Sequence, residues 1–294
     1  MDPVWTGRLL LTGADRRAYL QGLLTNDIGA LTPGTGCYAA MLNAQGRMLT
    51  DMHVFELGDS VLLTLPVSVT PSIREHLDRF IFTEDVAVQD VSASLAQIGV
   101  YGPRAEAIVT VARSRSGAVV VASDEAAVPG FDVLVDRGSA AAVREAFANA
   151  GAVPVNEADV ETVRVEHGRP RWGAEMDNDT IPLEAGIEDR AISRTKGCYV
   201  GQEVIVRVLD RGHGRVARRL VGLTFDPSAP VPAAGAEIVA GPSAKVGRIT
   251  SAVRSPALAR PIALGYVQRD FVEPGTPVQV AGAPATVVAL PFCP

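Results

Sequence analysis

The segment GCYAAMLNAQGRMLTDMHVFEL, residues 36–57, predicts two β-strands joined by a tight turn. Apolar residues fill both halves, and the NAQG between them contains asparagine and glycine, whose backbone preferences favour turns. The next residues, DSVLLTLP at 59–66, continue the pattern as a third strand. Strands joined by tight turns pair antiparallel, so this region does not predict a ladder of parallel βαβ units.

Helices are predicted on both sides of these strands. Residues 13–24, GADRRAYLQGLL, predict a helix with Ala18 and Leu23 towards the core. Residues 70–82, TPSIREHLDRFIF, predict another, with Pro71 at its first turn. Further strands are expected within 86–92, 95–102, 117–122 and 131–136, and further helices from Pro103, over 139–151 and over 156–168. The mixture favours an α+β fold class.

The pattern changes after about residue 215. Short strands such as RRLVGLTFD, residues 218–226, alternate with proline- and glycine-rich turns, and no helical period is present. Strands at this spacing predict a small β-barrel or sandwich. We therefore expect an N-terminal region of residues 1–213 and a C-terminal domain of residues 214–294.

Composition limits the function classes. The 294 residues carry a net charge of −6, which argues against wrapping of nucleic acid, and 47% of them are hydrophobic, which is enough to bury a core. The longest apolar runs are too short to span a bilayer, and the first residues do not resemble a signal peptide, so we expect a cytoplasmic protein without a membrane partner. Cys37, Cys198 and Cys293 lie far apart and the histidines are scattered, so neither a disulfide framework nor a metal site is predicted.

Basic side chains gather in one stretch near the boundary. The basic residues between 190 and 219 are Arg190, Arg194, Lys196, Arg207, Arg211, Arg215, Arg218 and Arg219. This basic stretch is either a solvated surface or a binding site for the anionic tail of a ligand.

Two carboxylates and an indole are candidate binding groups. Trp172 and Glu175 lie in an irregular stretch, where an aromatic wall and an acceptor of paired hydrogen bonds suit a flat heterocycle rich in N–H donors. The alternative is an ordinary polar connecting loop. Asp51 lies within an apolar strand, so its carboxylate is partnered, faces solvent, or lies at a cleft with a perturbed pKa.

Cys198 lies in KGCYVGQE, residues 196–203, just before a helix that Gly201 can open. The positive end of a helix, together with Lys196 and Arg194, favours a thiolate. The alternative is a buried cysteine that acts as a small apolar residue.

KGCYVGQE is very similar to the K-G-C-[FY]-x-G-Q-E signature of the YgfZ family, folate-binding proteins related to the T-protein of the glycine cleavage system. YLQGLLTNDIGAL (19–31), the segment 36–51, WGAEMDNDTIPLEAGI (172–187) and the β-rich tail extend the resemblance over nearly the whole chain. The resemblance implies three lobes in a ring, with two intertwined α/β lobes before a C-terminal β-barrel. It also implies a central opening that accepts tetrahydrofolate or a one-carbon derivative.

The resemblance also implies roles for single residues. Asp51 matches an acid that T-proteins use near folate N10, and Cys198 is the cysteine on which the YgfZ role depends; both are predicted to be catalytic. The residues predicted to bind the cofactor are Tyr38, Met41, Asn43, Trp172, Glu175, Glu184, Lys196, Gln202 and Arg207.

Two functions of different classes follow from the resemblance. The first is a monomeric cytoplasmic folate-binding protein that assists the assembly or repair of iron–sulfur proteins, including enzymes that modify tRNA. Its partners would be those proteins or their assembly factors, with no direct contact with nucleic acid. The second is a folate-dependent aminomethyltransferase or demethylase that acts on a small amine. A non-catalytic folate-binding scaffold is a third possibility.

Overall fold

The computed structural model of the chain describes residues 6–113, 117–124, 128–212, 214–241 and 244–293. The chain divides into two compact units, each made of two separate stretches. The first unit contains residues 1–156 and 189–202, and the second contains residues 157–188 and 203–294. The short stretch 189–202 therefore belongs to the first unit, although the residues on both sides of it belong to the second. We call it the returning stretch.

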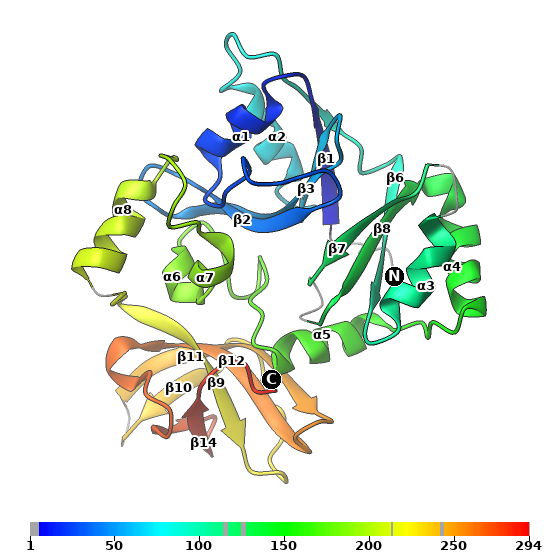
Figure 1. The fold of residues 1–294 in the computed structure, drawn as a ribbon. Helices are drawn as coiled ribbons and strands as arrows, with labels where there is room; N and C mark the ends of the chain where they lie inside the picture. The colour runs from blue at the N-terminus through cyan, green and yellow to red at the C-terminus, as the bar shows by residue number, and fades with distance from the viewer. Residues whose placement is uncertain (1–5, 114–116, 125–127, 213, 242–243, 294) are drawn as a thin grey trace. The chain divides into compact units, whose positions relative to one another are not determined.

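The first unit begins with an antiparallel sheet of five strands in the order β2-β3-β4-β1-β5. The strands are β1 (Thr6–Thr12), β2 (Gly36–Leu42), β3 (Met48–Glu56), β4 (Val61–Pro66) and β5 (Ala87–Asp90). Helices α1 (Arg16–Leu23) and α2 (Thr70–Asp78) pack on one face of it, as Figure 1 shows for this part of the chain. Leu20 of α1 and Leu77 of α2 are fully buried in the core they share with Leu9 and Val54.

A second sheet completes this unit, with three antiparallel strands in the order β6-β8-β7. Its elements are β6 (Leu95–Tyr101), α3 (Ala105–Arg113), β7 (Val119–Ser123), β8 (Gly130–Asp136), the 3₁₀ turn η1 (Arg137–Ser139) and α4 (Ala140–Asn149). Helices α3 and α4 share one core with the sheet. A separate apolar cluster joins the two sheets, since it contains Phe55 and Leu62 from the first and Val121 and Leu134 from the second.

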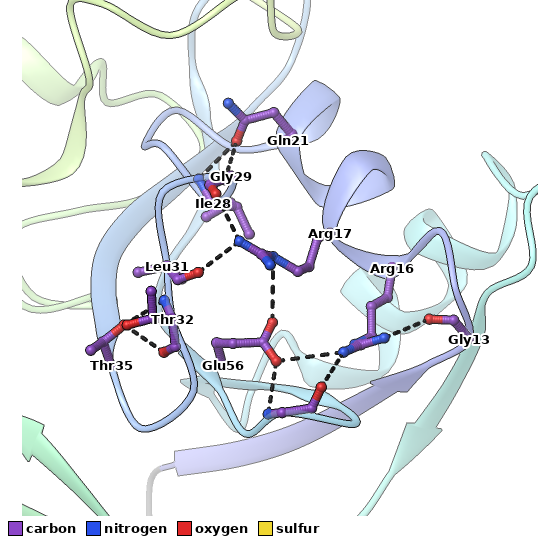
Figure 2. Close-up of polar contacts among 11 residues, drawn as sticks. Gly13, Arg16, Arg17, Gln21, Ile28, Gly29, Leu31, Thr32, Thr35 and Glu56 are labelled. Carbon is purple, nitrogen blue, oxygen red and sulfur yellow. Dashed lines mark hydrogen bonds and ion pairs between the residues drawn. The ribbon is translucent and has the colours of Figure 1, made fainter.

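A buried ionic cluster holds the loop that follows α1 (Figure 2). The side chain of Glu56 is only 2% exposed and lies 3.5 Å from Arg16 and 3.6 Å from Arg17. Arg17 also donates to the carbonyls of Gly29 and Leu31, at 2.7 and 2.6 Å. A buried carboxylate needs such partners, because desolvation without them is costly. The cluster therefore fixes the loop against the sheet.

The second unit consists of short helices and a closed barrel. The helices are α5 (Glu157–Glu166), α6 (Pro182–Ala185), α7 (Glu188–Ala191) and α8 (Gln202–Val206), of which α7 and α8 straddle the limits of the units, and α8 runs on into the π turn η2 (Arg207–Arg211). The barrel order is β10-β11-β12-β9-β14-β13. Its elements are β9 (Arg218–Phe225), β10 (Glu237–Ala240), β11 (Ala244–Ser255), β12 (Arg260–Gln268), the 3₁₀ turn η3 (Arg269–Phe271), β13 (Pro277–Val280) and β14 (Ala283–Val288).

The predicted α+β class with a C-terminal barrel is confirmed, and closure of the strands excludes the sandwich. Two details are wrong. Ala18 is exposed, whereas Leu23 is buried as predicted and shares the buried face of α1 with Tyr19 and Leu20. The helix expected over 70–82 ends at Asp78, and Phe82 is 80% exposed beyond it. Within the part of the chain that the structure describes, no helix is both long and apolar enough to cross a membrane.

Candidate functional site

Tyr38, Asp51 and His53 lie on one face of the first sheet. Tyr38 of β2 pairs directly with His53 of β3, and Asp51 lies two residues away on the same strand. Side chains two residues apart point to the same side of a strand. The Tyr38 hydroxyl donates a hydrogen bond of 2.8 Å to Asp51 Oδ2, so the three side chains form one cluster.

Burial leaves two polar atoms of this cluster without partners. Among the described residues, neither Asp51 Oδ1 nor His53 Nε2 has a hydrogen-bond partner. Desolvation raises the pKa of Asp51, although the hydrogen bond from Tyr38 and the charge of Arg190 act against it. Desolvation also lowers the pKa of His53 to about 4, which keeps its imidazole neutral at pH 7. The cluster can therefore exchange a proton at Asp51 without competition from a charged histidine.

Arg190, from the returning stretch 189–202, covers the cluster on one side. Its guanidinium lies 4.7 Å from the centre of the Tyr38 ring and forms an ion pair of 3.2 Å with Asp124. The side-chain amide of Asn26 donates to the backbone carbonyls of both Tyr38 and Arg190. These contacts fix the arginine beside the tyrosine.

A cavity of about 600 Å³ adjoins Tyr38 within the same unit. It is lined by Gly36, Cys37, Tyr38, His53, Phe55, Gly102, Pro103, Ala105, Glu106, Ala122, Ser123, Asp124, Pro129, Gly130 and Phe131. Burial raises the pKa of the Cys37 thiol to about 12, so the thiol in this wall is neutral. The volume falls within the range of small-molecule sites.

Met41 and Asn43 differ from Tyr38 in their surroundings. Met41 is three residues from Tyr38, so alternation turns it to the opposite face, where it is 1% exposed in the core with Leu24. Asn43 shapes the β2–β3 turn, since its side-chain oxygen accepts from the backbone N–H groups of Gln45 and Arg47, each at 3.0 Å. Met41 is therefore too buried to contact a ligand, whereas Asn43 is half-buried and its side-chain oxygen is engaged within the turn.

KGCYVGQE anchors the returning stretch to the first unit. The Lys196 ammonium donates to the carbonyls of Gln21, Leu24 and Asn26, and burial lowers its pKa to about 8. Gly201 has φ +83° and lies against the β2–β3 turn, where a Cβ atom would be 2.5 Å from the Asn43 carbonyl oxygen. All three Lys196 donors are thus engaged within the protein.

Cys198 and Gln202 of the same motif are more accessible. Cys198 is exposed, so the alternative of a buried apolar cysteine is wrong. Gln202 is half-buried and opens α8, as predicted for the residue after Gly201.

The predicted residues of the second unit fall into two groups. Glu175 is 4% exposed, and its carboxylate accepts from Arg164, from the Ser251 hydroxyl and from the Arg171 backbone N–H. Glu184 forms an ion pair of 3.2 Å with Arg218. Both carboxylates are therefore engaged by protein groups.

Trp172 and Arg207 have more accessible positions in that unit. Trp172 is half-buried beside Gly173, and Arg207 is exposed at the start of η2. Of the second-unit residues predicted to bind the cofactor, Trp172 and Arg207 are therefore the ones with accessible side chains.

Three hydrogen bonds to its carboxylate make Glu175 a structural group. The sequence alone could not distinguish this role from that of a pterin acceptor.

Similarity to known proteins identifies the family. The GCVT N-terminal domain matches residues 1–135, and the glycine cleavage T-protein C-terminal barrel domain matches residues 218–293. The aminomethyltransferase of Streptomyces avermitilis is 30% identical, over 97% of this chain and 84% of that protein. The chain belongs to the glycine cleavage T-protein family. The aminomethyltransferase of Saccharopolyspora erythraea is 29% identical, over 99% of this chain and 85% of that protein.

A solved T-protein has the same fold. The glycine cleavage system aminomethyltransferase T from Bartonella henselae superposes with a TM-score of 0.87 at 22% identity, over 98% of this chain and 84% of that chain. At this identity the likeness establishes the fold. The relatives from Streptomyces avermitilis and Saccharopolyspora erythraea are named aminomethyltransferases, and proteins of the T-protein family bind tetrahydrofolate.

The residues of the T-protein-like first unit fit such a cofactor. Asp51 Oδ1 is a buried acceptor without a partner among the described residues, and a reduced folate carries N–H donors. Glu175 does not fit, because its oxygens already accept three hydrogen bonds. The fit therefore depends on Asp51 of the first unit.

Sequence reasoning missed His53, Arg190 and Asp124 as neighbours of Asp51. Strand alternation could have found His53, because it lies two residues from Asp51. The sequence marks Arg190 only as part of the basic stretch 190–219 and gives no signal for Asp124. Arg190 lies over the Tyr38 ring and Asp124 pairs with Arg190, and these tertiary contacts leave no local pattern in the sequence.

Proposed function

We propose that this T-protein relative is a folate-dependent one-carbon transferase that acts on a small amine, with Asp51 as its catalytic acid–base. The observation that carries the proposal is the buried Oδ1 atom of Asp51, which has no partner among the described residues. The names of the relatives from Saccharopolyspora erythraea and Streptomyces avermitilis favour this function over iron–sulfur protein assembly.

The chain's own residues would act as follows. Bound tetrahydrofolate supplies the nitrogen that accepts a one-carbon unit. Asp51 Oδ1 would accept a hydrogen bond from an N–H group placed against it and would take or return that proton, and burial favours this exchange by raising the pKa of the carboxyl group. Tyr38 fixes the orientation of the carboxylate through Oδ2. His53 stays neutral and does not compete for the proton.

Asp51→Asn tests the proposal, because asparagine can still accept from Tyr38 but cannot take a proton. We expect the rate of one-carbon transfer from candidate methylamines to tetrahydrofolate to fall by about 100-fold or more. Tetrahydrofolate affinity, measured by calorimetry and Trp fluorescence, should stay within about threefold. Cys198→Ser is the matched control and should keep its turnover. Equal turnover in Asp51→Asn and the unchanged protein would contradict the proposal.

A second function is favoured by the exposure of Cys198. Within KGCYVGQE, Lys196 and Tyr199 are buried, whereas the thiol lies at the surface. This position supports a YgfZ-type role in which Cys198 meets iron–sulfur proteins or their assembly factors. Under this hypothesis the protein is a cytoplasmic monomer that supports tRNA-modifying enzymes.

Cys198→Ser distinguishes this second function. The variant should bind tetrahydrofolate normally but fail to restore iron–sulfur enzyme activities in a deletion strain. Cys293→Ser, at a half-buried cysteine, is the control and should restore them. Full restoration by Cys198→Ser would remove the thiol from the function.

A further inference from the structure

A second cavity, of about 700 Å³, lies on the outer side of the barrel. Its lining residues come from β9, β10, β12, β13 and β14 and from the turns that follow β9 and β10, so it belongs to the second unit alone. Phe225, Val278 and Ala285 form its floor, because they are buried in the barrel core. Their neighbours along each strand point outwards and form its walls.

The walls are mainly apolar, with hydroxyl groups between them. Thr286 of β14 lies directly opposite Thr224 of β9 and Pro277 of β13, so the three side chains form one row across the outer face. Pro284 of β14 and Pro227 of the turn after β9 add two further rigid rings. Such a mixture of apolar surface and a few polar groups is usual for sites of small organic ligands.

Arg260 at the start of β12 supplies a positive charge to this lining. The residue is half-buried, and its side chain forms no hydrogen bond or ion pair within the described part of the chain. A guanidinium that loses part of its hydration without gaining a partner is costly. An anion placed in the cavity would supply the partner that the protein does not.

Asp226, at the end of β9, is the carboxylate nearest to this arginine in the lining, and it is engaged elsewhere. The backbone N–H and the hydroxyl of Ser228 donate to Asp226 Oδ1, at 2.9 and 2.6 Å. These hydrogen bonds lower the pKa of Asp226, and the charge of Arg260 also acts to lower it. The carboxylate therefore stays ionised near Arg260, and it disfavours a ligand with two negative charges.

The turn that holds Asp226 is fixed without a ligand. Arg254 of β11 donates to the backbone carbonyls of Pro227 and Ala229, at 2.9 and 2.8 Å. One side of the cavity is thus preformed by contacts within the barrel, which lowers the entropic cost of binding.

We propose that this cavity binds a small organic acid that has one carboxylate and an apolar body. The carboxylate lies against Arg260, whose planar guanidinium matches two carboxylate oxygens. The body covers the proline rings, and Asp226 excludes ligands with a doubly charged head. The proposal concerns the second unit and does not require the transferase function.

Hexanoate is a suitable probe, because it combines one carboxylate with a short apolar chain. We expect saturable binding of hexanoate to the full-length protein, followed by NMR titration. Hexanamide lacks the charge, acetate lacks the apolar chain, and hexyl phosphate carries nearly two charges on its head. Each of these three should bind at least about tenfold more weakly than hexanoate.

Variants of Arg260 test its role directly. Arg260→Gln should weaken hexanoate binding by about tenfold or more, and Arg260→Lys, which keeps the charge but loses the planar fork, should lie between the two. Thr286→Trp should abolish binding by filling the cavity. Arg248 is an exposed arginine of β11 that does not line the cavity, so Arg248→Gln and Arg248→Trp are the matched controls and should bind like the unchanged protein.

Absence of saturable hexanoate binding to the unchanged protein would overturn the proposal. Binding of hexanamide, acetate or hexyl phosphate as tight as that of hexanoate would also overturn it, and this comparison stays decisive if Arg260→Gln does not fold. Equal binding by Arg260→Gln and Arg248→Gln, both shown to be folded by urea unfolding, would remove Arg260 from the site. Asp51→Asn should bind hexanoate like the unchanged protein, so failure of the transferase proposal and failure of this one give different results.

Discussion

At the residue scale, the chemistry of the first unit depends on alternation along β3. Asp51 and His53 share a face, and both are desolvated, yet burial acts on their pKa values in opposite directions. The acid resists losing its proton and the imidazole resists gaining one. Burial therefore disfavours the charged form of both groups.

His53 makes the stability of the protein depend on pH. Its pKa is lowered to about 4 in the folded protein, while the unfolded chain keeps the ordinary value of 6.5. Between these values the unfolded state binds more protons, so stability is lost as the pH falls from 6.5 towards 4. We expect this residue to account for a loss of roughly 2–3 kcal/mol in the free energy of unfolding between pH 7 and pH 4.5.

His53→Gln removes the titrating group. Between pH 7 and pH 4.5 its free energy of unfolding should therefore fall by roughly 2–3 kcal/mol less than that of the unchanged protein. Urea unfolding at both pH values measures this difference. His76→Gln is the comparison, because His76 on α2 lies outside the cavity lining and is only half-buried. Desolvation also lowers the pKa of His76, so this variant should lessen the loss, but by less than His53→Gln. Identical pH dependence in His53→Gln and the unchanged protein would show that the imidazole is hydrated in the folded state.

At the element scale, the returning stretch 189–202 is fastened to the loop after α1. Thr25 accepts a backbone hydrogen bond from Ser193 and donates one to the Ala191 carbonyl. Lys196 adds three hydrogen bonds, one to the carbonyl of Gln21 in α1 and two to the carbonyls of Leu24 and Asn26 after it. This attachment brings Arg190 to Tyr38.

Lys196→Met therefore tests a structural role against the predicted cofactor-binding one. Methionine keeps the length of the side chain but leaves buried carbonyls without donors, so we expect a loss of about 2–4 kcal/mol in the free energy of unfolding. Arg207→Met, at an exposed position, should change it by less than about 0.5 kcal/mol. A Lys196→Met protein with unchanged stability and weakened tetrahydrofolate binding would instead support direct contact with the cofactor.

At the scale of the whole molecule, the chain forms two units that do not follow a single cut in the sequence. Helix α5 belongs with the barrel, because Val165 is fully buried against Leu220, Ile262 and Leu264. The Glu166 carboxylate also accepts a hydrogen bond from Ser255 of β11. A barrel without α5 would expose an apolar face.

A fragment of residues 157–294 should therefore be more stable than one of residues 214–294. We expect the thermal midpoint of the shorter fragment to lie at least about 10 °C lower, because it loses the contacts of Val165 and Glu166. Val165→Asp in the longer fragment should lower its midpoint in the same way. Equal midpoints of the two fragments would instead support an independent domain of residues 214–294.

The sequence alone determined the order and kind of most elements, because strand alternation, helical periodicity and turn residues are local properties. It also placed Asp51 and Tyr38 in neighbouring strands of one hairpin, and the octapeptide 196–203 indicated a resemblance to the YgfZ family, which is related to T-proteins. Only the tertiary structure decided which polar groups are engaged. Ser251 binds Glu175 across 76 residues, and Lys196 binds Leu24 across 172. Such partners meet through packing of distant segments, which no local pattern records, and this packing made Glu175 and Lys196 structural while it left Asp51 Oδ1 without a partner among the described residues.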